Sequence, residues 1–364
     1  MDWIVSVNNA VNAIAWGYIL LACVLGGGLY LTVRTGFLQF RKFAYAMKNT
    51  IGKMFHRQKA GAGAITPFQA VSTALAATIG TGNIVGTSQA IALGGYGAVF
   101  WMWVAALFGM VIKYSEVVLA IRYRERNAAG DWVGGPMYYI TNGLGKSWKW
   151  LAGLFAAFGA LAAFGIGNMS QANSIAGAVN TAAAAFNPAA AGAAGTINLA
   201  VGIILAVFAG LVLLGGLKRI GAVAEKLVPF MSVVYGLCTL TVILMNIGRV
   251  GDALGKIFVG AFDPSAVLGG AFGITVSRTV TWGLKRSAFS NEAGLGSAPI
   301  AHAAAHTDSP VAQGLYGIFE VFMDTIIICT LTALTIVVSE VPVQFAVKPG
   351  AELIGSGRPG LATK

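Results

Sequence analysis

Long apolar segments alternate with short polar or basic segments along most of this chain. The apolar segments are about 20 residues long, which is enough for a helix to cross a bilayer. We therefore predict eight membrane spans, near residues 13–33, 67–92, 97–121, 150–179, 197–217, 227–247, 264–284 and 314–338. After residue 338 the chain changes to a segment containing Pro and Gly, in which we expect no further span.

The second predicted span is interrupted near its middle. Its central residues are glycines and small polar residues, which break regular helix; they are Gly80, Thr81, Gly82, Asn83 and Gly86. Unpaired backbone groups cannot face lipid, so such a break must line a cavity inside the protein. We predict that residues 79–86 form a ligand site.

The seventh predicted span has a similar interruption at Gly269, Gly270 and Gly273. Seven of the 24 Lys and Arg residues lie in 34–59, which predicts a cytoplasmic loop there and an N-terminus outside. On this topology the two interrupted spans cross the membrane in opposite senses. Paired interruptions of this kind indicate an inverted-repeat transporter with its solute near mid-membrane.

The basic loop itself carries apolar residues at three- and four-residue spacing, which predicts an amphipathic helix on the inner surface. The apolar residues are Phe37, Phe40, Ala44, Met47, Ile51, Met54 and Phe55. The alternative for this loop is a solvated charged segment.

Composition agrees with a polytopic membrane protein, since 57% of residues are hydrophobic, only 10% are charged, and the mean hydropathy is +0.75. The net charge of +11 collects in short loops, so it reflects topology and not a nucleic-acid partner. The three cysteines stand singly in apolar runs and predict neither a disulfide nor a metal site. The sequence contains no Ser/His/Asp or HExxH grouping at a spacing that would predict an enzyme.

The length of one repeat predicts where the second repeat should end. Two halves that start near residues 67 and 264 are each about 200 residues long, so the second would end near residue 460. We therefore expect that the helices completing the second repeat are absent. A non-transporting remnant or a passive channel of the same scaffold is the alternative function.

Ionisable residues inside predicted spans are functional candidates by default. Four of them are expected to form a gate or ion pair near the cytoplasmic end: Lys113, Glu116, Glu320 and Asp324. His302 and His306 stand four residues apart and could suggest a metal pair, but with Asp308 they are expected in a solvated inner loop.

Four sequence blocks carry a resemblance to a known family: GTGNIVG at 80–86, GGYGAVFWMW at 94–103, GGPMYYI at 134–140 and FSNEAGLGSAPIAHA at 289–303. Together they resemble the alanine or glycine:cation symporter (sodium:alanine symporter) family. The resemblance implies an all-α, leucine-transporter-type inverted-repeat fold with one extra N-terminal helix, here with an incomplete second repeat. Residues 1–338 would form the transporter domain and 339–364 a tail outside the family.

The resemblance also implies sodium-coupled import of small neutral amino acids such as alanine and glycine across a prokaryotic inner membrane, by a monomer without an organic cofactor. The substrate would be held by Thr81, Gly82 and Gln171 at its carboxylate and by Phe272 and Val276 at its methyl group. Sodium would bind the carbonyls of Thr78 and Ile79 with Asn83 and Thr275.

Overall fold

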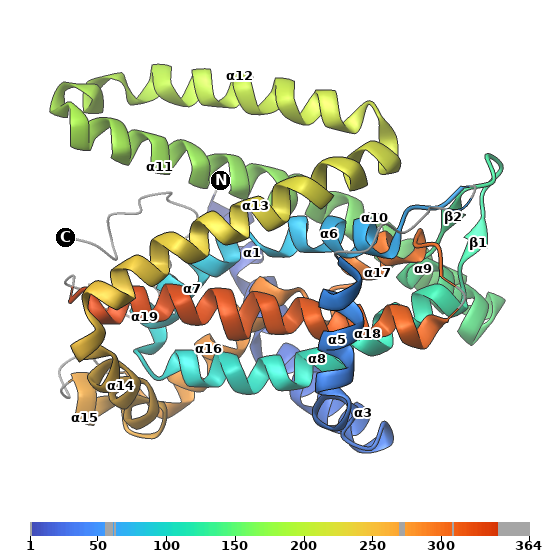
Figure 1. Cartoon of the computed structure of the whole chain (residues 1–364), viewed down its shortest axis with the longest axis horizontal. Coiled ribbons are helices and arrows are strands. Elements are labelled where there is room, and N and C mark those ends of the chain that lie inside the picture. Colours follow the sequence, from blue (N-terminus) through green and yellow to red (C-terminus); the bar gives the residue numbers. More distant parts are fainter. Residues whose placement is uncertain (1, 55–60, 62, 269–273, 308, 341–364) are drawn as a thin grey trace.

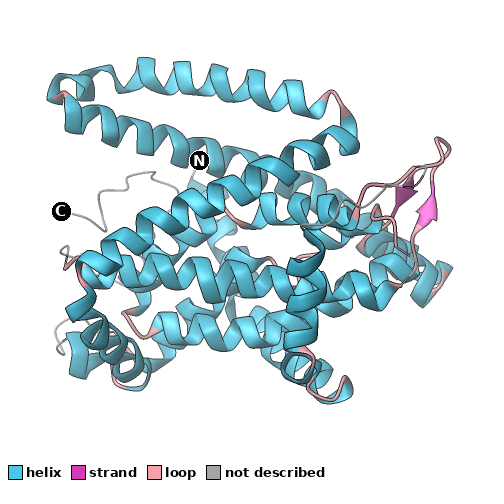
Figure 2. Cartoon of the chain, in the orientation of Figure 1, coloured by secondary structure: helices cyan, strands magenta, loops and turns pink. Residues whose placement is uncertain are grey.

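The computed structural model describes residues 2–54, 61, 63–268, 274–307 and 309–340, and its elements are almost all helices (Figure 2). Strands β1 (Glu125–Arg126) and β2 (Trp132–Val133) form a short antiparallel pair. Among the described residues, six helices are long and apolar enough to cross a membrane: Val5–Arg34, Ala98–Arg122, Lys146–Phe186, Pro188–Leu213, Gly216–Met245 and Pro310–Val338. The chain is therefore an all-α membrane protein.

The first long helix joins α1 (Asp2–Ile14), α2 (Leu20–Ala22) and α3 (Gly28–Arg34) through π-helical turns at Ala15–Ile19 and Cys23–Gly27. Gly28 lies against α8 (Ala98–Arg122), because a Cβ atom there would be 2.5 Å from Phe108 Cβ. Gly26 and Gly27 have no such neighbour within 4 Å. One glycine of the three therefore brings this helix close to the bundle.

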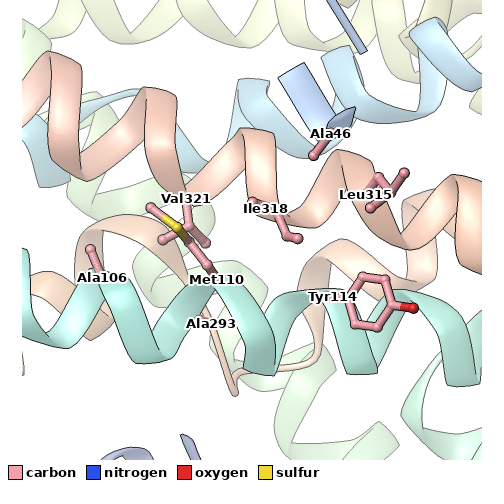
Figure 3. Packing of buried hydrophobic residues seen from close by; sticks show 8 residues of the cluster. All are labelled: Ala46, Ala106, Met110, Tyr114, Ala293, Leu315, Ile318 and Val321. Carbon is pink, nitrogen blue, oxygen red and sulfur yellow. The ribbon is translucent and has the colours of Figure 1, made fainter. Parts of the chain in front are cut away.

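The centre of the molecule is α8 packed against the last long helix (Figure 1). That helix consists of α18 (Pro310–Val321), a π-helical segment at Phe322–Cys329, and α19 (Thr330–Val338). Gly314 lies beside Tyr114 while Val321 lies beside Gly109, so the two helices are antiparallel. Their shared apolar cluster is shown in Figure 3 and comprises Ala46, Ala106, Met110, Tyr114, Ala293, Leu315, Ile318 and Val321.

The basic segment after α3 folds into α4 (Leu38–Arg41) and α5 (Phe43–Met54), so a helix is present where the sequence predicts one. Its buried face matches the predicted apolar face only in part, since Met47 packs against the core. Ala46 and Thr50 are buried against α18, whereas Ala44 and Ile51 are exposed. Packing on the central bundle, and not only on a membrane surface, selects the face of α5.

Other elements surround this centre: α9 (Pro136–Tyr139), a π-helical turn (Ile140–Leu144), a 3₁₀ turn (Lys146–Trp148), α10 (Lys149–Ala162), α11 (Ser170–Phe186), a 3₁₀ segment (Pro188–Ala193), α12 (Ala194–Leu213), α13 (Gly216–Met245), a 3₁₀ turn (Ile247–Arg249), α14 (Val250–Phe262) and α15 (Pro264–Leu268). A π-helical segment at Ala163–Met169 joins α10 to α11, and α11 and α12 form a hairpin above α13 in Figure 1. Leu199, Phe208 and Leu211 on α12 are exposed. Exposed apolar side chains on a long apolar helix are typical of a lipid-facing surface.

Candidate functional site

The second predicted span is two helices and not one. Helix α6 (Pro67–Thr78) begins at Thr66, whose side chain accepts from the Gln69 N–H in a capping box. It ends at Thr78, because Ile79 is extended (φ −80°, ψ 102°). A π-helical turn at Gly82–Gly86 then leads into α7 (Thr87–Gly94). The interruption predicted over 79–86 is therefore a short break at Ile79 and Gly80 followed by a π-helical turn.

Polar groups meet the backbone at this break. The Gly80 N–H donates to Asn83 Oδ1 (2.8 Å), and the Thr81 N–H donates to Gln171 Oε1 (3.3 Å). Gln171 comes from α11, and a Cβ atom on Gly80 would lie 3.1 Å from its Oε1. Of the predicted substrate residues, the structure thus brings Thr81 and Gln171 together, with glycine leaving room for the contact.

A second interruption separates α16 (Val276–Asn291) from α17 (Ser297–Ala303). Between them Glu292 (φ 55°), Gly294 (φ 90°) and Gly296 (φ 78°) adopt left-handed conformations. Left-handed backbone is unfavourable for a residue with a Cβ atom, so Glu292 is strained by about 1 kcal/mol. The sequence predicted an inner loop between the spans at 264–284 and 314–338, which is wrong because α16 runs on to Asn291 and α17 follows it. The predicted break at Gly269, Gly270 and Gly273 lies outside the described residues.

The two interruptions lie at the same level of the bundle. At one end of α7 and α16, Thr279 Oγ1 donates to the Gly94 carbonyl (2.7 Å). At the other end, a Cβ atom on Gly82 would lie 3.0 Å from Ser290 Cα, so α7 and α16 are antiparallel. Helix α17 continues beside α6, where the Ile65 N–H donates to the Ala304 carbonyl (3.0 Å). The half-helices α7 and α16 therefore lie together on one side of the two breaks, and α6 and α17 lie together on the other side.

A buried polar cluster lies where the breaks meet. Its centre is Asp324, fully buried in the π-helical segment of the last long helix. Its Oδ1 accepts from Asn83 Nδ2 (2.5 Å) and from Ser290 Oγ (3.1 Å), and its Oδ2 accepts from Thr325 Oγ1 (2.7 Å). Asn291 Nδ2 extends the cluster by donating to Thr325 Oγ1 (3.1 Å).

None of these donors to Asp324 carries a charge, and no ion pair to its carboxylate exists within the described ranges. A buried carboxylate is costly unless a proton, a metal or a basic residue compensates it. The sequence had grouped Asp324 with the gate candidates. The structure instead sets it beside Asn83 at the break, a placement that follows from helix packing and that the isolated span did not predict.

The other gate candidates form a separate group. Lys113 Nζ lies 3.2 Å from Glu320 Oε2, with both side chains fully buried, and Glu116 Oε2 accepts from the Gly294 N–H (3.1 Å). His302 belongs with them, because its Nε2 bonds to Glu320 Oε1. The prediction that His302 lies in a solvated loop is wrong, since the side chain is completely buried. Among the described residues no group of three or more acidic, His or Cys side chains is arranged for a metal ion.

Two predicted residues lie away from the break. Thr275 caps the start of α16 by accepting from the Arg278 N–H (3.3 Å), and Val276 beside it is partly exposed. Ser290, which contacts Asn83, is 15 residues further along the helix, or about 22 Å at 1.5 Å per residue. The structure therefore does not bring Thr275 or Val276 to Asn83. Phe272 lies outside the described residues.

Comparison with known proteins shows the family of this sequence. The profile of the sodium:alanine symporter family matches residues 1–357, so the match includes most of the segment predicted to lie outside the family. A sodium/alanine symporter of Methanococcus maripaludis is 48% identical over 341 residues, covering 93% of this chain and 71% of that protein.

Two relatives from Bacillus subtilis show how far the likeness extends. A probable sodium/glutamine symporter is 40% identical over 90% of this chain and 64% of its own length. A putative sodium/proton-dependent alanine carrier is 38% identical over 90% of this chain and 63% of its own length. These names describe transporters and not enzymes. The chain belongs to the sodium:alanine symporter family.

Proposed function

We propose that this protein imports small neutral amino acids, alanine and glycine, together with sodium, and that both bind where the two interruptions meet. The observation that carries the proposal is the buried carboxylate of Asp324, which has no ion-pair partner among the described residues and lies beside the broken backbone at Ile79 and Gly80. A break offers backbone groups to a solute, and a lone buried carboxylate favours a bound cation. We further propose that the N-terminus is outside and that the 34–59 segment is cytoplasmic.

The amino acid would lie along the first break. Its carboxylate would meet the N–H groups that begin the π-helical turn Gly82–Gly86, at the positive N-terminal end of the half-helix that continues as α7. Gln171, which already contacts the Thr81 N–H, would support it from α11. The ammonium group would meet the last carbonyls of α6 around Thr78 and Ile79. Gln171 and Ser290 lie tight against Gly80 and Gly82, which limits the site to small side chains.

Sodium would bind at Asp324. The oxygens already gathered there are a carboxylate and two hydroxyls, from Ser290 and Thr325, and Na⁺ is a hard cation that prefers such oxygen ligands. Asn83 would hold the Asp324 carboxylate in place, since its Nδ2 donates to Asp324 Oδ1. Its Oδ1 accepts from the Gly80 N–H at the break. The same side chain thus links the cation site to the amino-acid site.

The paired half-helices support an inverted-repeat architecture. The first interrupted segment precedes α8 and the second precedes α18, in each case after a short connection. Helices α8 and α18 are antiparallel, as are α7 and α16. The two repeats, each beginning with an interrupted helix, therefore run in opposite senses through the bundle. Transporters with such inverted repeats expose a central site alternately to the two sides of the membrane.

Uptake of labelled alanine into proteoliposomes tests the function. An inward sodium gradient is expected to drive accumulation, unlabelled glycine to compete, and collapse of the gradient with a sodium ionophore to abolish accumulation. A potassium gradient of equal size is the control. Uptake that is independent of the gradient, or no uptake by folded protein, would contradict sodium-coupled import.

Changing Gln171 to Ala is expected to raise the half-saturating alanine concentration about tenfold, because a hydrogen bond to a charged group contributes about 1.5 kcal/mol. The measurement is initial uptake rate against alanine concentration at saturating sodium. Asn180→Ala on the same helix is the matched control, since the hydrogen bonds of Asn180 within the described residues go to Ala176 and Asn198 in the α11–α12 hairpin. Equal affinities of the two variants would remove Gln171 from the site.

A further inference from the structure

The second interruption is held from one side by two residues of α8. Lys113 Nζ donates to the Asn291 carbonyl (2.7 Å), at the last residue of α16. One turn further on, Glu116 Oε2 accepts from the Gly294 N–H (3.1 Å). A broken helix leaves carbonyl and N–H groups without helical partners, and these two side chains supply one of each kind.

The contacts of Lys113 continue to α17. Its ammonium group is 3.2 Å from Glu320 Oε2 on α18, and Glu320 Oε1 bonds to His302 Nε2 on α17. Gln313 Nε2 faces His302 Nδ1 at 2.8 Å. An amide nitrogen only donates, so Nδ1 accepts and Nε2 carries the proton that it donates to Glu320. A chain of hydrogen bonds and one ion pair therefore runs from the second interruption, through Lys113 on α8 and Glu320 on α18, to His302 on α17.

Stability alone does not account for this arrangement. A buried ion pair contributes little net stability, because the cost of removing two charges from water offsets their attraction. Here the bonding capacity of the pair is directed at the backbone of the interruption and at the one imidazole of α17. Such contacts fix the relative positions of α16, α17 and the bundle.

Asn291 connects this chain of bonds to the proposed cation site. Its carbonyl accepts from Lys113, while its amide donates to Thr325 Oγ1 (3.1 Å), which in turn donates to Asp324. A cation that draws Thr325 and Asp324 together would therefore act on Asn291. Any displacement of α17 from the bundle would have to break the bond between His302 and Glu320.

We propose that Lys113, Glu116, His302 and Glu320 form a buried latch, in which Lys113 and Glu320 are positioning residues that couple sodium occupancy at Asp324 to the position of α17. The proposal rests on the sodium-coupled function proposed above. Sodium closes the latch by fixing Asn291, and α17 is then held against α8 and α18. Without sodium the latch loosens, and α17 is free to open the inner side.

The test uses the double variant Lys113→Met with Glu320→Gln, because either change alone leaves a buried charge unpaired. Hydrogen–deuterium exchange of α17 is measured with and without sodium, together with the sodium dependence of alanine uptake. In the wild type, sodium is expected to slow exchange in α17. In the double variant that response is lost and half-saturating sodium rises about fivefold, at the low end of typical couplings between sites.

Two further variants keep the test decisive. His302→Leu removes only the link to α17, and it is expected to abolish the exchange response while leaving the Lys113–Glu320 pair in place. Asp252→Asn with Lys256→Met removes an exposed ion pair on α14 (2.6 Å) and is the matched control. Wild-type responses in both latch variants would overturn the latch and leave the proposed function standing. Failure of wild-type protein to respond to sodium at all would overturn both.

Discussion

Replacing Asp324 by Asn is expected to reduce sodium-driven alanine uptake to the level of empty liposomes. Asparagine has nearly the shape of aspartate and still accepts from Asn83 Nδ2, so the packing around residue 324 is retained. What is lost is the negative charge, which in a buried site with no ion-pair partner in the described part of the chain is the main reason for a cation to bind. We therefore expect an effect larger than that of any neutral residue in the site.

Thermal unfolding in detergent separates loss of binding from loss of fold. If sodium binds only to the folded wild-type protein, it raises the free energy of unfolding, and this increase grows with the logarithm of the sodium concentration. The Tm of the wild type would therefore rise with sodium. The Asp324→Asn variant is expected to have a similar Tm without sodium and no increase with it, whereas Gln171→Ala retains the increase. Sodium-driven uptake by Asp324→Asn would show that the cation binds elsewhere.

The first interruption could be predicted because its cause is local. Gly80, Gly82 and Asn83 are poor helix residues, and they stand in the middle of a segment that is otherwise apolar enough to span. The contact of Thr81 with Gln171 rested on family resemblance, and the two residues do meet. The boundaries were less accurate, since residues 82–86 form a π-helical turn and not an irregular segment.

The second interruption was missed although its residues were visible. Gly294 and Gly296 follow α16 and precede α17 and the last span, as Gly80 and Gly82 follow α6 and precede α7 and α8. The seventh span was predicted to end near residue 284, just before the basic residues Lys285 and Arg286. In the folded chain Arg286 is covered by the rings of Trp282 and Phe289, so a charged residue did not mark the end of the helix.

Tertiary partners account for the remaining differences. Lys113 and Glu320 are 207 positions apart in the chain, and His302 reaches Glu320 only because α17 and α18 both pack against α8. His302 stands among alanines, and nothing in the neighbouring sequence indicates that Glu320 is its partner. The choice between the two faces of α5 depends likewise on α18, which lies far away in sequence.

The close approach of α16 to α8 leads to the second large expected effect. A Cβ atom on Gly283 would lie 2.5 Å from the Ala98 carbonyl oxygen and 2.6 Å from Trp101 Cβ. Neither atom is the end of a flexible side chain, so in Gly283→Ala the helix α16 must move away from α8. Overpacking of this kind costs about 1–3 kcal/mol, and we expect a Tm several degrees lower.

The displacement should also reach the site, because the same face of α16 bears Ser287, whose Oγ donates to the Met102 carbonyl (3.0 Å), and Ser290 one turn later. We therefore expect Gly283→Ala to lose most sodium-driven uptake as well as stability. Gly202→Ala on α12 is the matched control, since nothing lies within 4 Å of its Cβ position and alanine favours helix by about 1 kcal/mol. Equal Tm values for the two variants would mean that α16 does not have to move away from α8, and wild-type uptake by Gly283→Ala would mean that this contact does not set the position of Ser290.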